Sequence, residues 1–430
     1  MGVVFSIFPS FSVYFSSLIQ ILNMKFFGLL IILTLVACIK TPDQGNQKPA
    51  LLLNYTTDGL QLQLQGSATD ADGKITSLTV NWGDKKVSKF LNNDFSQLAI
   101  NHTYTNPDGY EIRVSTIDDF GDSTVQLVQA VVDFKETSLT GIKESMYKTT
   151  ENEYLILTTN LHTYQEVLQN EKFNLITDVI GMMDIDFIAF QECAQNKSSQ
   201  ITDSIIREDN MALIITNRLK EKYNVDYNYV WNWAHYGWEV WEEGVAVLSK
   251  YPLLDSEDRY VSSGTNTTSI TSRKIIYGAY QIPEGEIHVF SAHTHWRTTL
   301  TDQEQNHQIE NIQAMVNEKE SWYFGALSVV CGDFNVNPTS EYPWSEGYNT
   351  MVKNNGYQDT FFEIYPNAND KPAQAIYNTI GGDLPGRIDY IFMKPDDRLQ
   401  VIDSQIIFTN DIIGRVSDHF GVLTKVRFVR

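Results

Sequence analysis

The hydrophobic residues of this chain follow two different patterns. Between about residues 50 and 134, apolar and polar residues alternate, as in LQLQLQ at 60–65. A period of two is typical of strands that bury one face. Turn signals at Asp72-Gly73, Asp108-Gly109 and Phe120-Gly121 separate these runs. The pattern predicts a small all-β, immunoglobulin-like sandwich over 50–134.

After a polar connector at 135–150, the pattern changes to short apolar runs that alternate with helical segments. The runs predicted to be strands are 244–250, 274–282, 286–295, 327–331, 387–393, 399–408 and 420–428. Residues 301–318 place Ile309, Ile312 and Val316 on one helical face, and Thr301 and Glu304 have the spacing of a capping box. This alternation predicts a layered α/β (α+β) domain over 151–430.

The stretch VVCGDFNVNP at 329–338 combines a buried strand with polar residues at its tip. Gly332 is expected to let the backbone turn where the strand ends. On an extended backbone, Asp333 and Asn335 point the same way, so both can converge on a metal-bound phosphate or on its attacking water. A strand end followed by an Asx turn, stopped by Pro338, explains the same residues.

Other polar residues follow or lie within apolar runs in the same way. They are Asn160 after 154–157, Glu192 closing DIDFIAFQE, His295 closing EIHVFSAHTH, Asp389 within GRIDYIF, and Asp418 with His419 opening SDHFGVLTKV. In this order the segments resemble the endonuclease/exonuclease/phosphatase superfamily of metal-dependent phosphodiesterases. The resemblance implies a four-layered sandwich of two facing β-sheets flanked by helices, with the site where strand ends meet.

The resemblance also implies a role for each residue of the site. Asn160, Glu192 and Asp418 match residues at the metal, which is expected to be Mg²⁺, with Mn²⁺ or Ca²⁺ as alternatives. Asp333 and Asn335 match the pair that orients the attacking water and a nonbridging oxygen. Asp389 is expected to hydrogen-bond His419, which exchanges the proton. An aspartate inside so apolar a strand would be costly without a partner.

Three further residues are expected to bind or support the phosphate. The family's TH signature selects His295, although His293 on the same strand is an alternative. Glu243 matches an acid that supports this histidine. Arg273 matches an arginine that contacts the phosphate, or it is a charge at a strand edge. The nearby His235 and aromatic cluster (Trp231, Trp233, Tyr236, Trp238 and Trp241) either belong to the core or stack on a sugar, base or lipid surface.

Charge narrows the range of partners. The 430 residues include 32 Lys and Arg against 53 Asp and Glu, a formal charge of −21. This argues against broad nonspecific clamping of nucleic acid. The phosphate-ester substrate can be nucleic acid, a phospholipid or a soluble phosphate ester. A surface binding protein that keeps the fold as a scaffold is the alternative, and the complete set of site residues disfavours it.

The first 49 residues predict export. Residues 24–37 have the form of a signal peptide, and Leu35-Val36-Ala37-Cys38 resembles a bacterial lipobox. A lipidated Cys38 would anchor the protein in a membrane, expected to be the outer membrane or the cell surface; an uncleaved anchor is the alternative. Residues 38–49 are then a tether. Residues 1–23 are unnecessary to this signal and are interpreted as an upstream start-site artefact.

The sandwich at 50–134 resembles a polycystic-kidney-disease (PKD) domain. The matching segments are NWGD at 81–84, HTY at 102–104 and DDFG at 118–121. Such a domain would space the enzyme from the membrane or contact carbohydrate or protein. Asp70-Ala-Asp72-Gly73 is interpreted as a turn and not as a calcium loop, because it lacks the glycine and glutamate of an EF-hand. Cys193 and Cys331 are predicted to be buried free thiols.

Overall fold

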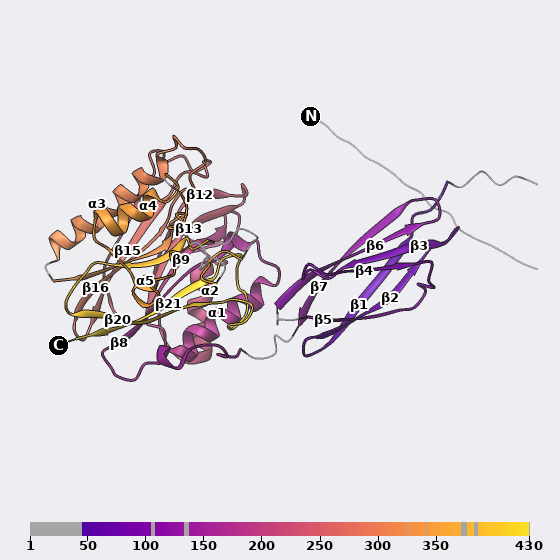
Figure 1. Ribbon diagram of the computed structural model, residues 1–430, viewed down its shortest axis with the longest axis horizontal. Coiled ribbons are helices and arrows are strands. Elements are labelled where there is room, and N and C mark those ends of the chain that lie inside the picture. Colours follow the sequence, from indigo (N-terminus) through magenta and orange to yellow (C-terminus); the bar gives the residue numbers. More distant parts are fainter. Residues whose placement is uncertain are drawn as a thin grey trace, which may run out of the picture. The chain divides into compact units, whose positions relative to one another are not determined.

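The computed structural model of this protein describes residues 45–104, 108–132, 137–323, 325–341, 343–370, 376–381 and 386–429 (Figure 1). The predicted leader at 24–37 and the lipobox cysteine, Cys38, lie outside these residues. In the described part of the chain, no helix is both long and apolar enough to cross a membrane.

Residues 50–132 include seven described strands in two sheets. The first sheet has the order β1-β2-β5 and the second β4-β3-β6-β7. Their bounds are β1 (Ala50–Asp58), β2 (Gln61–Thr69), β3 (Ile75–Asn81), β4 (Val87–Leu91), β5 (Leu98–Thr103), β6 (Asp108–Asp118) and β7 (Ser123–Val132). Leu62, Leu64, Val80, Trp82 and Val114 are among the buried side chains that form their core. The resemblance to a PKD domain stays a prediction.

Two six-stranded sheets organise the described part of the C-terminal domain, in the orders β12-β13-β9-β8-β21-β20 and β14-β15-β16-β17-β19-β18. The first sheet contains β8 (Glu153–Asn160), β9 (Phe187–Asn196), β12 (Asn228–Gly237), β13 (Trp241–Ser249), β20 (Leu399–Ile407) and β21 (Gly421–Phe428). The second contains β14 (Leu253–Tyr260), β15 (Lys274–Ile282), β16 (Gly285–His293), β17 (Leu327–Asp333), β18 (Gln358–Asp359) and β19 (Asp389–Met393). Only β8 with β9 and β16 with β17 pair in parallel among these strands.

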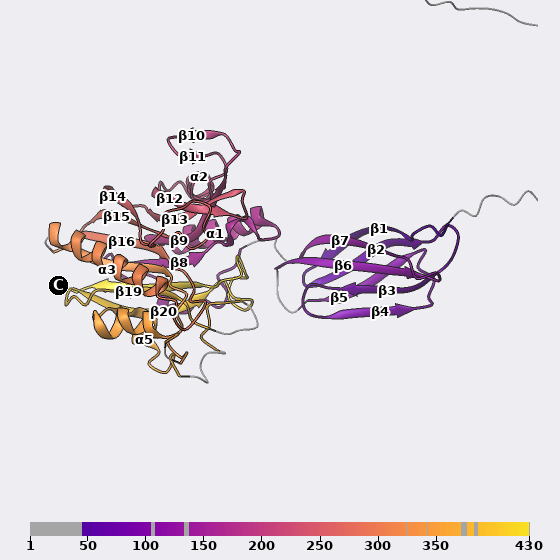
Figure 2. The same ribbon diagram turned by 90° about the horizontal axis from the view of Figure 1, so that it is seen from above.

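The two sheets face each other, and helices cover their outer faces (Figure 2). Ile156 and Val247 of the first sheet share one apolar cluster with Val289 and Val329 of the second. Helices α1 (Gln169–Met183) and α2 (Met211–Tyr223) pack on the first sheet, and α3 (Glu304–Trp322) and α4 (Glu346–Asn349) pack on the second. The remaining short elements are β10 (Ile201–Asp203), β11 (Ile206–Arg207) and α5 (Thr360–Ile364). Helix, sheet, sheet and helix are the four layers that the family resemblance implied.

The predicted start of helix α3 is wrong. The helix begins at Glu304, its N-cap residue is Gln303, and no side chain makes a capping bond from that position. The backbone N–H of Glu304 instead donates to Asp302 Oδ1 at 3.0 Å. Thr301 therefore lies too far upstream for a capping box. The apolar face is as predicted, because Ile309, Ile312 and Val316 are buried.

Gly332 has a different role from the predicted turn. Strand β17 continues through it to Asp333, and Gly332 lies directly opposite Ala292 of β16. Its φ is +150°, and a Cβ at this position would lie 1.9 Å from the Ala292 carbonyl oxygen. Glycine is required here because the two backbones approach closely. Cys193 and Cys331 are both free and buried, as predicted.

Candidate active site

Strand register brings three site residues into one row of the second sheet. Asp333, the last residue of β17, lies opposite His293 at the end of β16 and opposite Asp389 at the start of β19. Side chains directly opposite one another in a ladder lie on the same face of the sheet. The row His293–Asp333–Asp389 is therefore a consequence of where three neighbouring strands end.

His419 joins this row from the segment before β21. Its Nδ1 lies 3.0 Å from Asp389 Oδ2 and 3.2 Å from Oδ1, and its Nε2 lies 3.8 Å from Asp333 Oδ2. Burial opposes the charged imidazolium, but the charges of Asp389 and Asp333 outweigh it and hold the pKa of His419 well above its ordinary value. Asp389 thus orients the ring and leaves Nε2 toward the cavity.

Glu192 reaches the site through an irregularity in β9. The preceding Gln191 donates to Ser291 Oγ of the second sheet at 3.0 Å, so strict alternation would send Glu192 to the opposite face. Instead, Glu192 has φ +46°, and the register of β9 with β13 shifts at this point. Bulges of this kind redirect side chains next to functional sites. As a result, Asn160 Nδ2 donates to Glu192 Oε1 at 3.0 Å and to Asp333 Oδ2 at 3.2 Å.

Carboxylates are crowded at this edge. Burial, followed by the charge of Glu243, raises the pKa of Glu192 to about 7. Burial, followed by the charge of Asp389, raises the pKa of Asp333 to about 7. Burial also acts on Glu243, but its contact with His235 outweighs this and holds the pKa of Glu243 below its ordinary value. The side chains around Glu192 and Asp333 therefore carry too little positive charge to stabilise the ionised form of these two carboxylates.

One cavity of about 430 Å³ unites these groups. Most of the predicted site residues line it, namely Glu192, Glu243, Arg273, Asp333, Asn335, Asp418 and His419. Asn160 lies just behind the wall and contacts two of them. Arg273 is only 2% exposed, and its Nε is buried without a hydrogen-bond partner among the described residues. A buried guanidinium with an unused donor fits an anion in the cavity.

Two of the predicted placements differ from the structure. Strand β16 ends at His293, and it is His293, 3.6 Å from Asp333 Oδ2, that lines the cavity. His295 lies beyond the strand end, 3.3 Å from Asp302 Oδ2. Glu243 does not support His295, because its Oε1 lies 3.2 Å from His235 Nε2 and its Oε2 accepts from Thr163 Oγ1 at 2.8 Å. The early end of β16 is the reason for the first difference, and the second arises because Glu243 lies directly opposite His235 in the β12–β13 ladder.

The backbone conformation of Asn335 also differs from the extended one that was expected. Its φ is +49°, its N–H donates to Asp333 Oδ1 at 2.9 Å, and its side-chain Nδ2 donates to the Thr294 carbonyl at 2.9 Å. The Asx turn that the sequence offered as the alternative is therefore present. Both side chains still line the cavity, so the turn and the site coexist.

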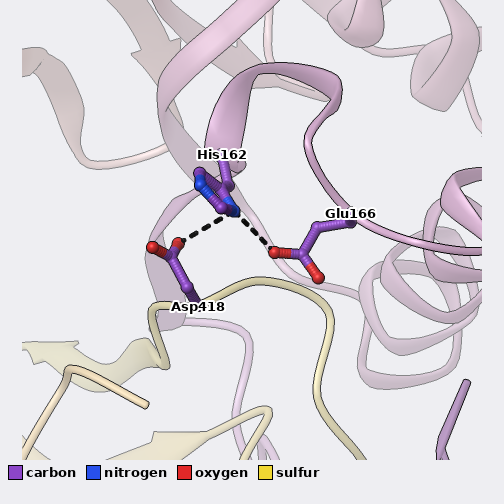
Figure 3. A group of neighbouring side chains, drawn as sticks. All are labelled: His162, Glu166 and Asp418. Atoms are coloured by element: carbon purple, nitrogen blue, oxygen red, sulfur yellow. Dashed lines mark hydrogen bonds and ion pairs between the residues drawn. The ribbon is translucent and has the colours of Figure 1, made fainter. Parts of the chain in front are cut away.

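His162 is a cavity residue that the sequence interpretation missed. Figure 3 shows it between two carboxylates, with Nδ1 at 2.7 Å from Glu166 Oε1 and 3.4 Å from Asp418 Oδ1. Glu166 is held in turn by Lys172 Nζ at 2.6 Å. Glu166 is thus satisfied by two bases, whereas Asp418 makes only the longer contact with His162 and keeps oxygen atoms that face the cavity. The spacing Asn160-Leu161-His162, two residues beyond a predicted ligand, is the signal that could have found it.

The cluster beside Glu192 fits a divalent cation. Ligand atoms of Glu192, Glu243 and His293 lie within 4.8 Å of one another. Both oxygens of Glu243 are already engaged by His235 and Thr163, so Glu192 is the carboxylate of this cluster that remains for a cation. Oxygen ligands suit Mg²⁺, and a bound cation would lower the raised pKa values of Glu192 and Asp333. A bound cation would neutralise the mutual repulsion of these crowded, partly enclosed carboxylates.

Comparison with known proteins identifies the family. The family model "Endonuclease/Exonuclease/phosphatase family" matches residues 157–419, which is more than half of the chain. The chain therefore belongs to the endonuclease/exonuclease/phosphatase family, whose members hydrolyse phosphate esters and generally depend on a divalent metal. No curated protein matches the chain.

Solved structures agree on the fold. An endonuclease/exonuclease/phosphatase family protein from Leptotrichia buccalis C-1013-b is 27% identical, with a TM-score of 0.55, over 64% of this chain and 100% of that one. An endonuclease/exonuclease/phosphatase from Beutenbergia cavernae DSM 12333 is 17% identical, with a TM-score of 0.50, over 64% and 72%. A mannosyl-6-phosphatase from Bacteroides thetaiotaomicron VPI-5482 is 17% identical, with a TM-score of 0.45, over 64% and 100%. The likeness to the Beutenbergia cavernae protein concerns the fold alone.

Because His293 lines the cavity and His295 does not, we expect their substitution to change kcat/KM by different amounts. His293→Ala is expected to lower kcat/KM by about 10- to 100-fold, because a hydrogen bond to a charged phosphate oxygen is worth roughly 1.5–3 kcal/mol. His295→Ala is expected to leave kcat/KM near the wild-type value. Steady-state kinetics on one phosphodiester, with circular dichroism to check folding, compare the two. A larger loss in the folded His295 variant would reverse the assignment.

Proposed function

We propose that this chain is a Mg²⁺-dependent phosphodiesterase, with Mn²⁺ or Ca²⁺ as alternative ions. The observation that carries this proposal is the Asp389–His419 pair, whose free Nε2 lies beside Asp333 in the same cavity as Glu192. A proton-exchanging group, a group that can orient water and an acidic ligand cluster thus share one small volume. Hydrolysis of a phosphate ester requires all three.

The residues of the chain divide the work as follows. Arg273 and His293 bind the phosphate oxygens at the cavity wall. Asp333 and Asn335, linked through the Asn335 N–H, orient the attacking water. His419 exchanges a proton at Nε2, while Asp389 keeps its ring in place through Nδ1. Each of these groups is held by at least one contact within the described structure, so little reorganisation is needed when substrate binds.

Glu192 and Asp418 are the residues that would hold the metal. Asn160, the third residue predicted there, positions Glu192 instead, because its Nδ2 donates to Glu192 Oε1 and its Oδ1 accepts from the His162 N–H. When bound, the ion supplies charge neutralisation at the phosphate and lowers the pKa of water. Asp418 remains accessible to solvent, with 46% of its side chain exposed, which suits a ligand that acts through water. Mg²⁺ usually keeps several of its own waters.

The proposal is tested by measuring hydrolysis with the full-length protein in detergent. Bis-p-nitrophenyl phosphate represents diesters and p-nitrophenyl phosphate represents monoesters, each with Mg²⁺, Mn²⁺, Ca²⁺ or EDTA. We expect the diester to be hydrolysed faster, and EDTA to abolish the reaction. Faster turnover of the monoester would assign a phosphatase instead. Binding without turnover under every condition would favour the scaffold alternative.

We further propose that the protein is exported and anchored through a lipid on Cys38. The proposal rests on the basic start, apolar core and lipobox-like end of residues 24–38. Cys38→Ala is expected to release a soluble or unprocessed protein, whereas wild type should sediment with membranes. Fractionation followed by immunoblotting measures this. Equal membrane partitioning of both proteins would exclude lipidation as the anchor.

A further inference from the structure

The cavity is bordered by large apolar side chains that remain exposed. Trp238 is 53% exposed, Trp296 42% and Ile270 54%, and all three line the cavity together with Glu192 and His419. Single exposed apolar residues are ordinary on protein surfaces. Three around the same catalytic opening, two of them tryptophans, indicate a surface that contacts a ligand.

These three residues come from separate segments, each of which is held in place. Trp238 lies in the turn between β12 and β13, where it has φ +47°, and its ring meets the edge of His162 with centroids 6.1 Å apart. Ile270 lies in the connection from β14 to β15. The Thr271 carbonyl in that connection accepts from Gln308 Nε2 at 3.2 Å. Trp296 lies three residues beyond the end of β16, where the N–H of the adjacent His295 donates to Gln308 Oε1 at 2.7 Å.

Neighbouring tryptophans show that core packing does not explain this exposure. Trp231 is buried, and its Nε1 donates to the Cys193 carbonyl at 2.8 Å. Trp241 stacks on Tyr164 with centroids 4.5 Å apart. Of the predicted aromatic cluster, Trp238 and Tyr236 are the members that line the cavity, whereas Trp231 and Trp241 belong to the fold.

The charges of the residues that line the cavity disfavour a polyanionic substrate. Among the described residues that line it, Arg273 is the only lysine or arginine, and it lies buried beside the catalytic groups. A nucleic-acid strand carries further phosphates on both sides of the one that reacts, and proteins neutralise them with Lys and Arg. Beyond the lining residues, Lys197 lies over the Tyr236 ring and donates to the Glu239 carbonyl, and the exposed side chains at the border itself are indole and aliphatic.

We propose that the substrate is a small ester with a single phosphate, whose organic part carries an uncharged ring that lies against Trp238 and Trp296. This inference rests on the phosphodiesterase activity proposed above and specifies its substrate. A cavity of about 430 Å³ is within the range of sites for small ligands. A nucleobase and a sugar ring both present a flat face to an indole, and the experiment separates these two sources.

Calorimetric binding of phosphonates tests the proposal without turnover, because each phosphonate mimics the monoester product of phosphodiester hydrolysis and its carbon–phosphorus bond is not hydrolysed. The full-length protein with Mg²⁺ is titrated with methylphosphonate and with phenylphosphonate. We expect phenylphosphonate to bind about 5- to 100-fold more tightly, the range that ring stacking on an aromatic side chain supplies. Trp238→Ala and Trp296→Ala should each reduce this ratio and leave the methylphosphonate Kd unchanged, and Trp238→Phe should restore it in part.

Trp322→Ala is the matched control, because Trp322 is 61% exposed at the end of α3 and does not line the cavity. A nucleoside 5′-phosphonate and a hexose 6-phosphonate then show which ring is preferred. Equal Kd values for methyl- and phenylphosphonate would overturn the proposal, as would tighter, strongly salt-dependent binding of a single-stranded oligonucleotide. Ring-selective binding without hydrolysis of any ester would overturn the phosphodiesterase assignment alone.

Discussion

His419→Ala should lower kcat by at least about 10²- to 10⁴-fold, the contribution of a positioned general acid or base. The imidazole is the group proposed to exchange a proton in this cavity, and its Nε2 lies 3.8 Å from Asp333 Oδ2. Because His419 is not one of the proposed metal ligands, the apparent affinity for Mg²⁺ should change little. His307→Ala, at an exposed position on α3, is the matched control and should keep wild-type kcat.

Asp389→Asn should cause a loss of similar size, because an amide at the position 3.0 Å from Nδ1 no longer enforces the same tautomer of His419. The two residues act as one unit, so the double variant should be little slower than either single variant. The measurement is kcat for the four proteins on one phosphodiester. Strictly multiplicative losses would show that Asp389 and His419 work independently.

Glu192→Gln is the second substitution with a large expected effect. The amide keeps the shape of the side chain and removes the charge that a hard cation requires. Residues that merely support metal ligands cost about 10- to 100-fold in affinity or activity when changed, so loss of a direct ligand should cost at least that much. The apparent affinity for Mg²⁺ and kcat at saturating Mg²⁺ are measured together.

Glu310→Gln, on the exposed face of α3, is the control for removing one negative charge from an acidic protein. It should match wild type in both quantities. Normal turnover of the Glu192 variant at low Mg²⁺ would show that this carboxylate is not a ligand. The site would then be built around the other carboxylates at the same edge.

Much of the site could be located from the sequence because its residues follow apolar runs. Asn160, Asp333 and Asp389 are each adjacent to or within such a run, and the structure places all three where strands end or begin at one edge. Burial of strands between two helical layers leaves their polar residues at the tips. The hydrophobic pattern therefore predicted a layered α/β domain, and the family resemblance predicted that the site lies where strand ends meet.

Local backbone geometry was beyond such prediction. The choice between His293 and His295 depends on β16 ending at residue 293, and apolar patterns place element ends only to within a few residues. Glu192 enters the site through a positive φ at a bulge, which no residue type in FIAFQE signals. Asn335 and Gly332 likewise have positive φ values. The sequence had predicted an extended backbone for Asn335, with an Asx turn as the alternative, and a simple turn at Gly332.

The sequence by itself determined which side chains were available and that strand ends would gather them, since hydrophobic periodicity reflects burial directly. Tertiary structure alone decided which side chains contact one another in the site. It paired Glu243 with His235 and placed His162 between Glu166 and Asp418. It also exposed Trp238 while burying Trp231. The physical reason is that contacts between distant segments depend on register and chain crossing, which short-range patterns do not encode.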